Sequence, residues 1–74
     1  MPTIKDFGNF KICMYFEDEK PPHVHVVGPN FEAKIRIRDQ AVYVGNLARK
    51  VERAAVKYIA DNRDDLIILW DEYK

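Results

Sequence analysis

The chain contains two histidines, and they stand two residues apart in the stretch Pro21-Pro22-His23-Val24-His25-Val26-Val27. Proline fixes its backbone and donates no hydrogen bond, so a strand can begin only after Pro22. The alternating, β-branched residues that follow predict this strand, and residues two apart on a strand project from the same face. Because imidazole titrates close to neutral pH, the two rings are the leading candidates for chemistry.

One chemistry open to two histidines is metal-independent cleavage of RNA. His23 and His25 would act as general acid and general base, one drawing the proton from a ribose hydroxyl and the other protonating the leaving oxygen. Side-by-side placement counts against this reading, because an acid and a base on opposite sides of a phosphate usually need a gap between them. The reading also requires cations for the phosphate and a stacking surface for a base, for which the candidates are Lys34, Arg36, Arg38 and Tyr15.

The same rings have a purely structural interpretation. Imidazoles at the start of a strand can close that end of a sheet and pair with a nearby carboxylate, here Glu32 or the acidic loop of residues 17–19. Titratable residues mark functional sites only in a minority of cases, so the sequence leaves both interpretations open.

Metal binding is a third interpretation, because two neutral imidazoles on one strand face can share an ion. A stable site normally needs a third protein ligand, and the sequence offers no cysteine pair and no second histidine cluster. We therefore predict no metal and no cofactor. The third ligand of such a site would have to come from Glu17, Asp18, Glu19 or Glu32.

The interpretation that we favour involves binding without catalysis. Lys34, Arg36 and Arg38 alternate along one predicted strand. Charged side chains on an edge strand can prevent it from pairing with another sheet, but this strand is expected inside the sheet, which weakens that explanation of the basic row. Such a row can follow the phosphate backbone of RNA, with an affinity that falls steeply as salt rises, or it can meet a small acidic partner protein. We expect Lys11 and Tyr15 to share this face.

Hydrophobic periodicity predicts strands followed by helices. An amphipathic helix is expected from Leu47 to about Ala60, with Asn46 as its N-cap, and a second helix from Asp64 onward. The fold class is therefore α+β: a four-stranded antiparallel meander packed on one face by one or two C-terminal helices. After a lead-in of residues 1–9, the strands are expected at residues 10–16, 23–27, 31–38 and 41–44, with Val42 and Val44 buried.

Register decides what the histidines face, because sliding a strand by one residue turns every side chain to the opposite face. If Val26 lies opposite Phe31, the valines join the apolar face and the histidines lie open to water beside the arginines. If Val27 lies opposite Phe31, the histidines go beneath the helices and two valines are exposed. We favour the first register because it buries more apolar surface.

Length and composition indicate one small globular domain over residues 1–74. Of the 74 residues 47% are hydrophobic and 32% charged, and the formal net charge is zero. Residues 31–57 nevertheless carry seven basic and three acidic groups, an excess of +4 that can attract anions. We expect a cytoplasmic chain with no membrane span and no signal peptide, because no long apolar run is present and Cys13 is a single cysteine. The oligomeric state is not predicted.

The order of several motifs resembles the bacterial family called domain of unknown function 4160. Its most specific part is Pro-Pro-His-x-His after an aromatic strand. The resemblance covers nearly the whole chain and implies a small bacterial protein, often encoded beside another small domain in what looks like a toxin–antitoxin pair. It implies no established activity and no catalytic residue. The motifs that carry it are Met14-Tyr15-Phe16, Pro21-Pro22-His23-Val24-His25-Val26, Phe31-Glu32-Ala33, Gly45-Asn46-Leu47 and the late helix from Leu66 to Trp70.

Overall fold

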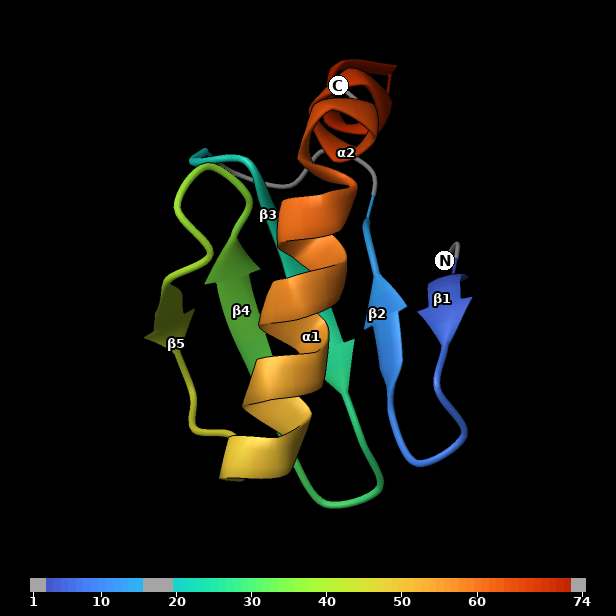
Figure 1. Ribbon diagram of the computed structural model, residues 1–74, viewed down its shortest axis with the longest axis vertical. Coiled ribbons are helices and arrows are strands. Elements are labelled where there is room, and N and C mark those ends of the chain that lie inside the picture. Colours follow the sequence, from blue (N-terminus) through green and yellow to red (C-terminus); the bar gives the residue numbers. More distant parts are fainter. Residues whose placement is uncertain (1–2, 16–19, 73–74) are drawn as a thin grey trace.

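The computed structural model describes residues 3–15 and 20–72, which form one antiparallel sheet and two helices (Figure 1). Each strand pairs with the strand before it, in the order β1-β2-β3-β4-β5. This is the predicted meander with C-terminal helices, and the α+β class is confirmed. The elements are β1 (Thr3–Asp6), β2 (Lys11–Cys13), β3 (His23–Val27), β4 (Glu32–Arg36), β5 (Val42–Val44), α1 (Arg49–Asp61) and α2 (Arg63–Glu72).

The sheet has a fifth strand, β1, where the sequence predicted a lead-in. Its last residue, Asp6, lies opposite Lys11 of β2. The connection turns at Gly8, which has a φ of 94° and whose N–H donates a hydrogen bond to Asp6 Oδ1 at 2.8 Å. The strand was missed because Ile4 is its one apolar residue, so no alternation marks it. The next predicted strand is shorter than expected, and Phe16 at its end lies outside the described residues.

The pairing of β3 with β4 settles the faces of the sheet. Val26 lies opposite Ala33, where the sequence favoured Phe31. The pairing is therefore displaced by two residues, and because side chains repeat every two residues, each one keeps its predicted face. His25 consequently lies opposite Lys34, on the face away from Val26.

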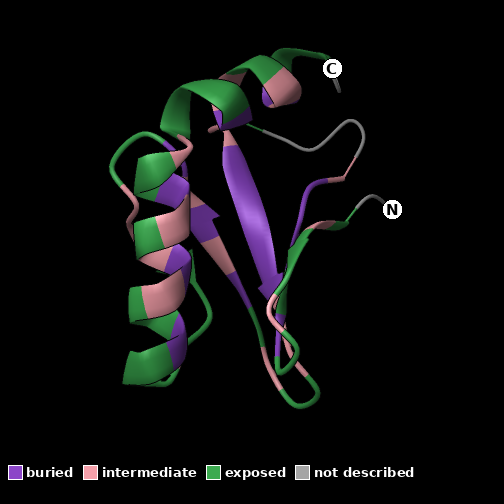
Figure 2. Cartoon of the chain, turned by 45° about the vertical axis from the view of Figure 1, so that its right-hand side comes forward, coloured by how far each residue is buried: buried purple, intermediate pink, exposed green. Residues whose placement is uncertain are grey.

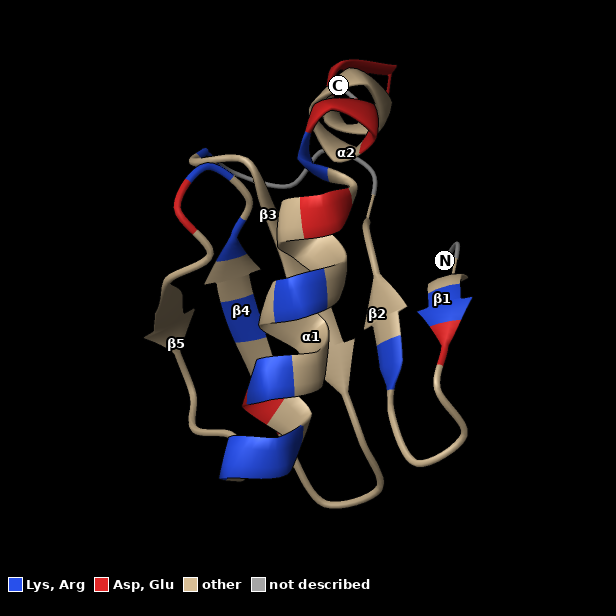
Figure 3. Cartoon of the chain, viewed as in Figure 1, with Lys and Arg blue, Asp and Glu red and all other residues tan. Residues whose placement is uncertain are grey.

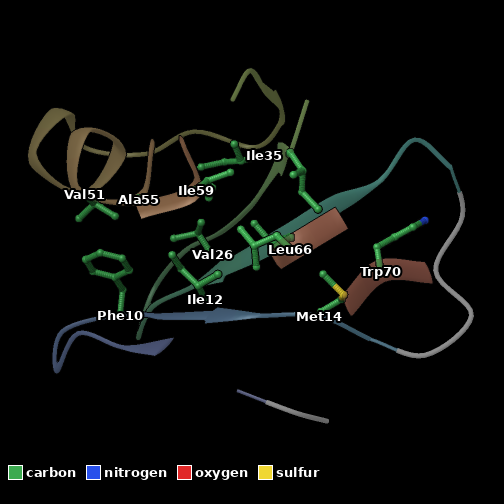
Figure 4. Close-up of a cluster of buried hydrophobic side chains, with 12 residues drawn as sticks. Phe10, Ile12, Met14, Val26, Ile35, Val51, Ala55, Ile59, Leu66 and Trp70 are labelled. Atoms are coloured by element: carbon green, nitrogen blue, oxygen red, sulfur yellow. The ribbon is translucent and has the colours of Figure 1, made fainter. Parts of the chain in front are cut away.

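The core lies between one face of the sheet and the helices. Helix α1 crosses this face, and α2 lies over the end of the sheet where β2 finishes and β3 begins (Figure 1). Figure 4 shows the side chains of both layers meeting there, with Trp70 of α2 beside Met14. The buried core residues are Phe10, Ile12, Met14, Val24, Val26, Ile35, Ile37, Val51, Ala55, Ile59, Leu66 and Trp70.

Helix α1 begins at Arg49, two residues later than the periodicity predicted. Its N-cap is Ala48, without a side-chain hydrogen bond, so the prediction of Asn46 as N-cap is wrong. The reason is the turn that precedes it: Gly45 has a φ of 81°, and a side chain there would meet the backbone of β4. Asn46 therefore belongs to the connection that leaves β5 rather than to the helix.

The two helices are separate. The break between them lies at Asn62, whose backbone N–H and side-chain amide both donate to the carbonyl of Tyr58, at 3.1 and 2.8 Å. Two acidic residues, Asp64 and Asp65, follow in the first turn of α2, where they complement the helix dipole as expected. Neither described helix combines the length and the apolar character needed to cross a bilayer.

Strand β5 differs from its prediction at one residue. Val42 packs against the core, but Val44 is 46% exposed. The pairing shifts between Lys34 and Ile35 of β4, so two residues of β5 match one step of β4 and its alternation is broken. The prediction that Val44 is buried assumed an unbroken alternation and is wrong.

Candidate functional site

The two histidines lie side by side on the face of β3 that α1 does not cover. Their ring centroids are 5.0 Å apart. The prediction that these rings are open to water is wrong, because His23 is 2% exposed and His25 is 6% exposed. Figure 2 shows β3 buried along almost its whole length. A substrate in water therefore does not reach either ring in this conformation.

Aromatic side chains from neighbouring elements surround the histidines. Tyr15 meets His25 edge-on, with ring centroids 4.3 Å apart, as its predicted place on this face requires. Tyr43 of β5 meets His23 in the same manner at 5.8 Å, and Trp70 of α2 lies 5.2 Å from His23. The alternation of polar residues along the strand predicted a face open to solvent. In the structure, large aromatic rings on both sides of the histidines cover this face.

Both imidazoles are held through Nδ1. His23 Nδ1 donates to the carbonyl oxygen of Pro21 at 2.8 Å, and His25 Nδ1 donates to Glu32 Oε2 at 3.0 Å. A carbonyl or carboxylate oxygen only accepts, so the Nδ1 of each ring carries a proton. The contact between a histidine and Glu32, which the structural interpretation predicted, is present at His25.

The described residues do not make a metal site. An imidazole whose Nδ1 is tied to a carbonyl or carboxylate is oriented as metal-binding histidines often are. A stable site still needs at least three protein ligands. Within residues 3–15 and 20–72 no three His, Cys, Asp or Glu side chains come together to hold an ion. The candidate ligands Glu17, Asp18 and Glu19 lie outside the described residues.

The predicted row of basic residues does not stay together. Arg36, at the end of β4, is already engaged: its Nε and Nη2 donate to the two carboxylate oxygens of Asp39 at 2.8 and 2.7 Å. The hydrogen bond from Arg36 lowers the pKa of Asp39 from 3.8 to about 2, and Asp39 raises the pKa of Arg36. Arg38 lies beyond the strand, in the turn that leads to β5, and is exposed.

The lysines of the predicted row also lie apart. Lys34 is half-buried opposite His25, whereas Lys11 is exposed at the start of β2. On the same face, Glu32 of β4 lies across β3 from Lys11 and contributes a carboxylate that is 54% exposed. Figure 3 shows further basic residues along the outer surface of α1, and acidic residues on α2. The histidine face is therefore not a continuous positive surface.

Two of the predicted arginines instead line a groove at the end of the sheet. The groove has a volume of about 960 Å³ and lies between the Pro21-Pro22 segment, the turn after β4, and α2. Arg38 and Arg63 are both exposed, and neither forms an ion pair with another described residue. The complete lining is Pro21, Pro22, Arg36, Arg38, Asp39, Arg63, Asp64, Ile67 and Ile68.

Comparison with known families identifies a single domain type. The model of a domain of unknown function, DUF4160, matches residues 9–71. The chain belongs to this family. No curated protein and no solved structure matches this chain. The DUF4160 match covers the elements described above except β1 and the last residue of α2, and it brings no assigned activity.

Arg63, Ile67 and Ile68 are among the groove residues that the sequence did not predict as part of a site. Arg63 comes just before the helix predicted from Asp64 onward, and the sequence assigned no binding role to either isoleucine. Arg38 and Arg63 are far apart in the chain, and only the fold brings them to one groove. The one local signal was Ile68, because Ile67 and Ile68 are adjacent on a helix and cannot both face the same core. Ile68 is 59% exposed.

Proposed function

We propose that this chain is a binding module for a small acidic partner protein, and that its histidines hold the structure rather than react. The observation that carries the proposal is the state of the two rings: both are buried, and each is anchored through Nδ1 to an acceptor. A general acid or base must reach the proton that it transfers, within hydrogen-bond distance or through one water. The cations Lys11, Arg38 and Arg63, in contrast, are exposed.

Charge distribution favours a protein over RNA as the partner. RNA binding depends on several cations that follow the phosphates together. Here Arg36 is neutralised by Asp39, and Glu32 places a carboxylate on the same face as Lys11 and Lys34. A protein partner needs fewer charges, because apolar contacts supply part of its binding free energy. Such a partner fits the toxin–antitoxin-like pairing that the resemblance implies and the cytoplasmic location expected from the sequence.

The experiment compares two short fluorescein-labelled probes of equal charge, a peptide of alternating glutamate and leucine and a uridine RNA. Fluorescence anisotropy is measured at low and at physiological salt, with EDTA present. We expect the peptide to bind about tenfold more tightly than the RNA, with an affinity that falls as salt rises. The RNA should remain intact, as judged on a denaturing gel.

Three results would overturn the proposal. Tighter binding of the RNA would make nucleic acid the partner. RNA cleavage by the wild-type protein that disappears in His25→Phe would restore the ribonuclease interpretation. Binding of neither probe would show that the exposed cations do not form an anion-binding surface.

A further inference from the structure

We infer that the groove between the Pro21-Pro22 segment, the turn after β4 and α2 holds an extended segment of the partner in which acidic side chains alternate with apolar ones. The inference rests on the proposed function and narrows it to one site and one ligand chemistry. Neither the family match nor the sequence reading assigns a role to this groove.

The positive charge of the groove comes from two arginines on different elements. Arg38 lies in the turn after β4, and Arg63 is the first residue of α2. Neither side chain forms an ion pair with another residue in the described part of the chain. The third guanidinium of the lining, that of Arg36, is occupied by Asp39 through two parallel hydrogen bonds. Two guanidiniums are therefore available, against the single remaining carboxylate of Asp64.

The ion pair within the groove indicates which anion fits. Arg36 binds the carboxylate of Asp39 with Nε and Nη2, the fork geometry that guanidinium groups form with carboxylates. A partner's aspartate or glutamate can be held by Arg38 and Arg63 in the same way. Arginine is also enriched at the energetic centres of protein interfaces.

Part of the groove lining is apolar, namely two prolines and two isoleucines, which argues for a segment rather than an isolated anion. Ile68 is 59% exposed, Ile67 is half-buried, and the two prolines on the opposite wall are half-buried. A phosphate or nucleotide strand would leave these isoleucines in water. A volume of about 960 Å³ lies at the upper end of the range of ligand pockets, roughly 300–1,000 Å³, so several side chains can enter.

The proline wall is held in place before any partner binds. Besides the hydrogen bond from His23 Nδ1 to the carbonyl of Pro21, the N–H of Ile37 donates to the carbonyl of Pro22 at 3.1 Å. A preorganised wall reduces the entropy lost on binding. His23, which is buried next to the groove, thereby has a structural role: it positions the proline wall.

The test uses labelled peptides of equal length with alternating Glu-Leu, Glu-Ser and Lys-Leu sequence, measured by fluorescence anisotropy. The groove variant is Arg38→Ser with Arg63→Ser. The matched control is Arg49→Ser with Arg53→Ser, which removes the same charge from exposed positions of α1 that also lack ion pairs with described residues. Urea denaturation of each variant checks that it is folded.

We expect Glu-Leu to bind most tightly, and its affinity to fall about tenfold or more in the groove variant and less than about twofold in the control. Ile68→Ser should remove most of the preference for Glu-Leu over Glu-Ser while leaving Glu-Ser binding unchanged. Titration of ¹⁵N-labelled protein with Glu-Leu should shift the amide signals of residues 36–39 and 63–68.

The outcomes separate this inference from the proposed function. If Glu-Leu binding survives in the groove variant and is lost in the α1 control, the groove is the wrong site, although an acidic partner remains. If Lys-Leu binds as tightly as Glu-Leu, the charge argument fails. If neither acidic peptide binds the wild-type protein, the proposed function itself is wrong.

Discussion

The two faces of β3 are both closed to solvent, but different physical interactions close them. On one face Val24 and Val26 pack beneath α1 in an aliphatic core. On the other face His23 and His25 lie among aromatic rings, and each makes a hydrogen bond through Nδ1. Burial of the first face depends on apolar surface removed from water, whereas burial of the second also involves ring contacts and the hydrogen bonds made at Nδ1. A polar residue in an alternating strand is therefore not necessarily an exposed one.

The largest effect is expected on the aliphatic face. Ile35→Ala removes a fully buried side chain of the core and leaves a cavity, so the free energy of unfolding should fall by about 3 kcal/mol. Urea denaturation followed by circular dichroism measures it. A loss of less than about 1 kcal/mol would mean that this face is not tightly packed.

A smaller effect is expected on the histidine face. His23→Phe keeps an aromatic ring but removes the donor to the Pro21 carbonyl, so we expect a loss of about 1 kcal/mol in the free energy of unfolding. The same measurement gives the value. If His23→Phe were as costly as Ile35→Ala, or if it stabilised the protein, the proposed division between the two faces would be incorrect.

The smallest effect is expected from the exposed ion pair at the end of β4. Because the pKa of Asp39 is lowered from 3.8 to about 2 in the folded chain, the pair stabilises the fold above about pH 4, and this contribution is lost as the pH falls toward 2. Asp39→Asn should therefore lower the urea midpoint slightly at pH 6, and the difference from wild type should shrink toward pH 2. A difference that grows as the pH falls would contradict this linkage.

Much of the fold could be predicted from the sequence because its pattern is strong. Strict alternation in residues 31–37 determined which side chains face inward, and the valines of β3 determined the parity of its pairing. The strands predicted at residues 31–38 and 41–44 also imply a tight connection between them, and the chain turns there. Edge elements were less predictable: β1 has one apolar residue, and the irregular pairing of β5 exposes Val44.

The candidate site was less predictable because it depends on tertiary contacts. No local pattern indicates that Tyr15, Tyr43 and Trp70 meet at the histidines, since these residues come from distant parts of the chain. Alternation also did not indicate that Arg36 would form an ion pair with Asp39, or that Arg38 and Arg63 would line the same groove. Residue type and spacing identified the histidines as candidates for chemistry, but they did not predict that both rings are buried.

The central claim, that the paired imidazoles are anchored inside the protein, is tested most directly by the ¹⁵N chemical shifts of the two rings. Long-range ¹H–¹⁵N spectra at neutral pH assign the proton-bearing nitrogen of His23 and His25. The hydrogen bonds to Pro21 and Glu32 predict a protonated Nδ1 in both rings, with slow exchange of that proton with water. A bare Nδ1 in either ring, or rapid exchange typical of an exposed imidazole, would contradict the account.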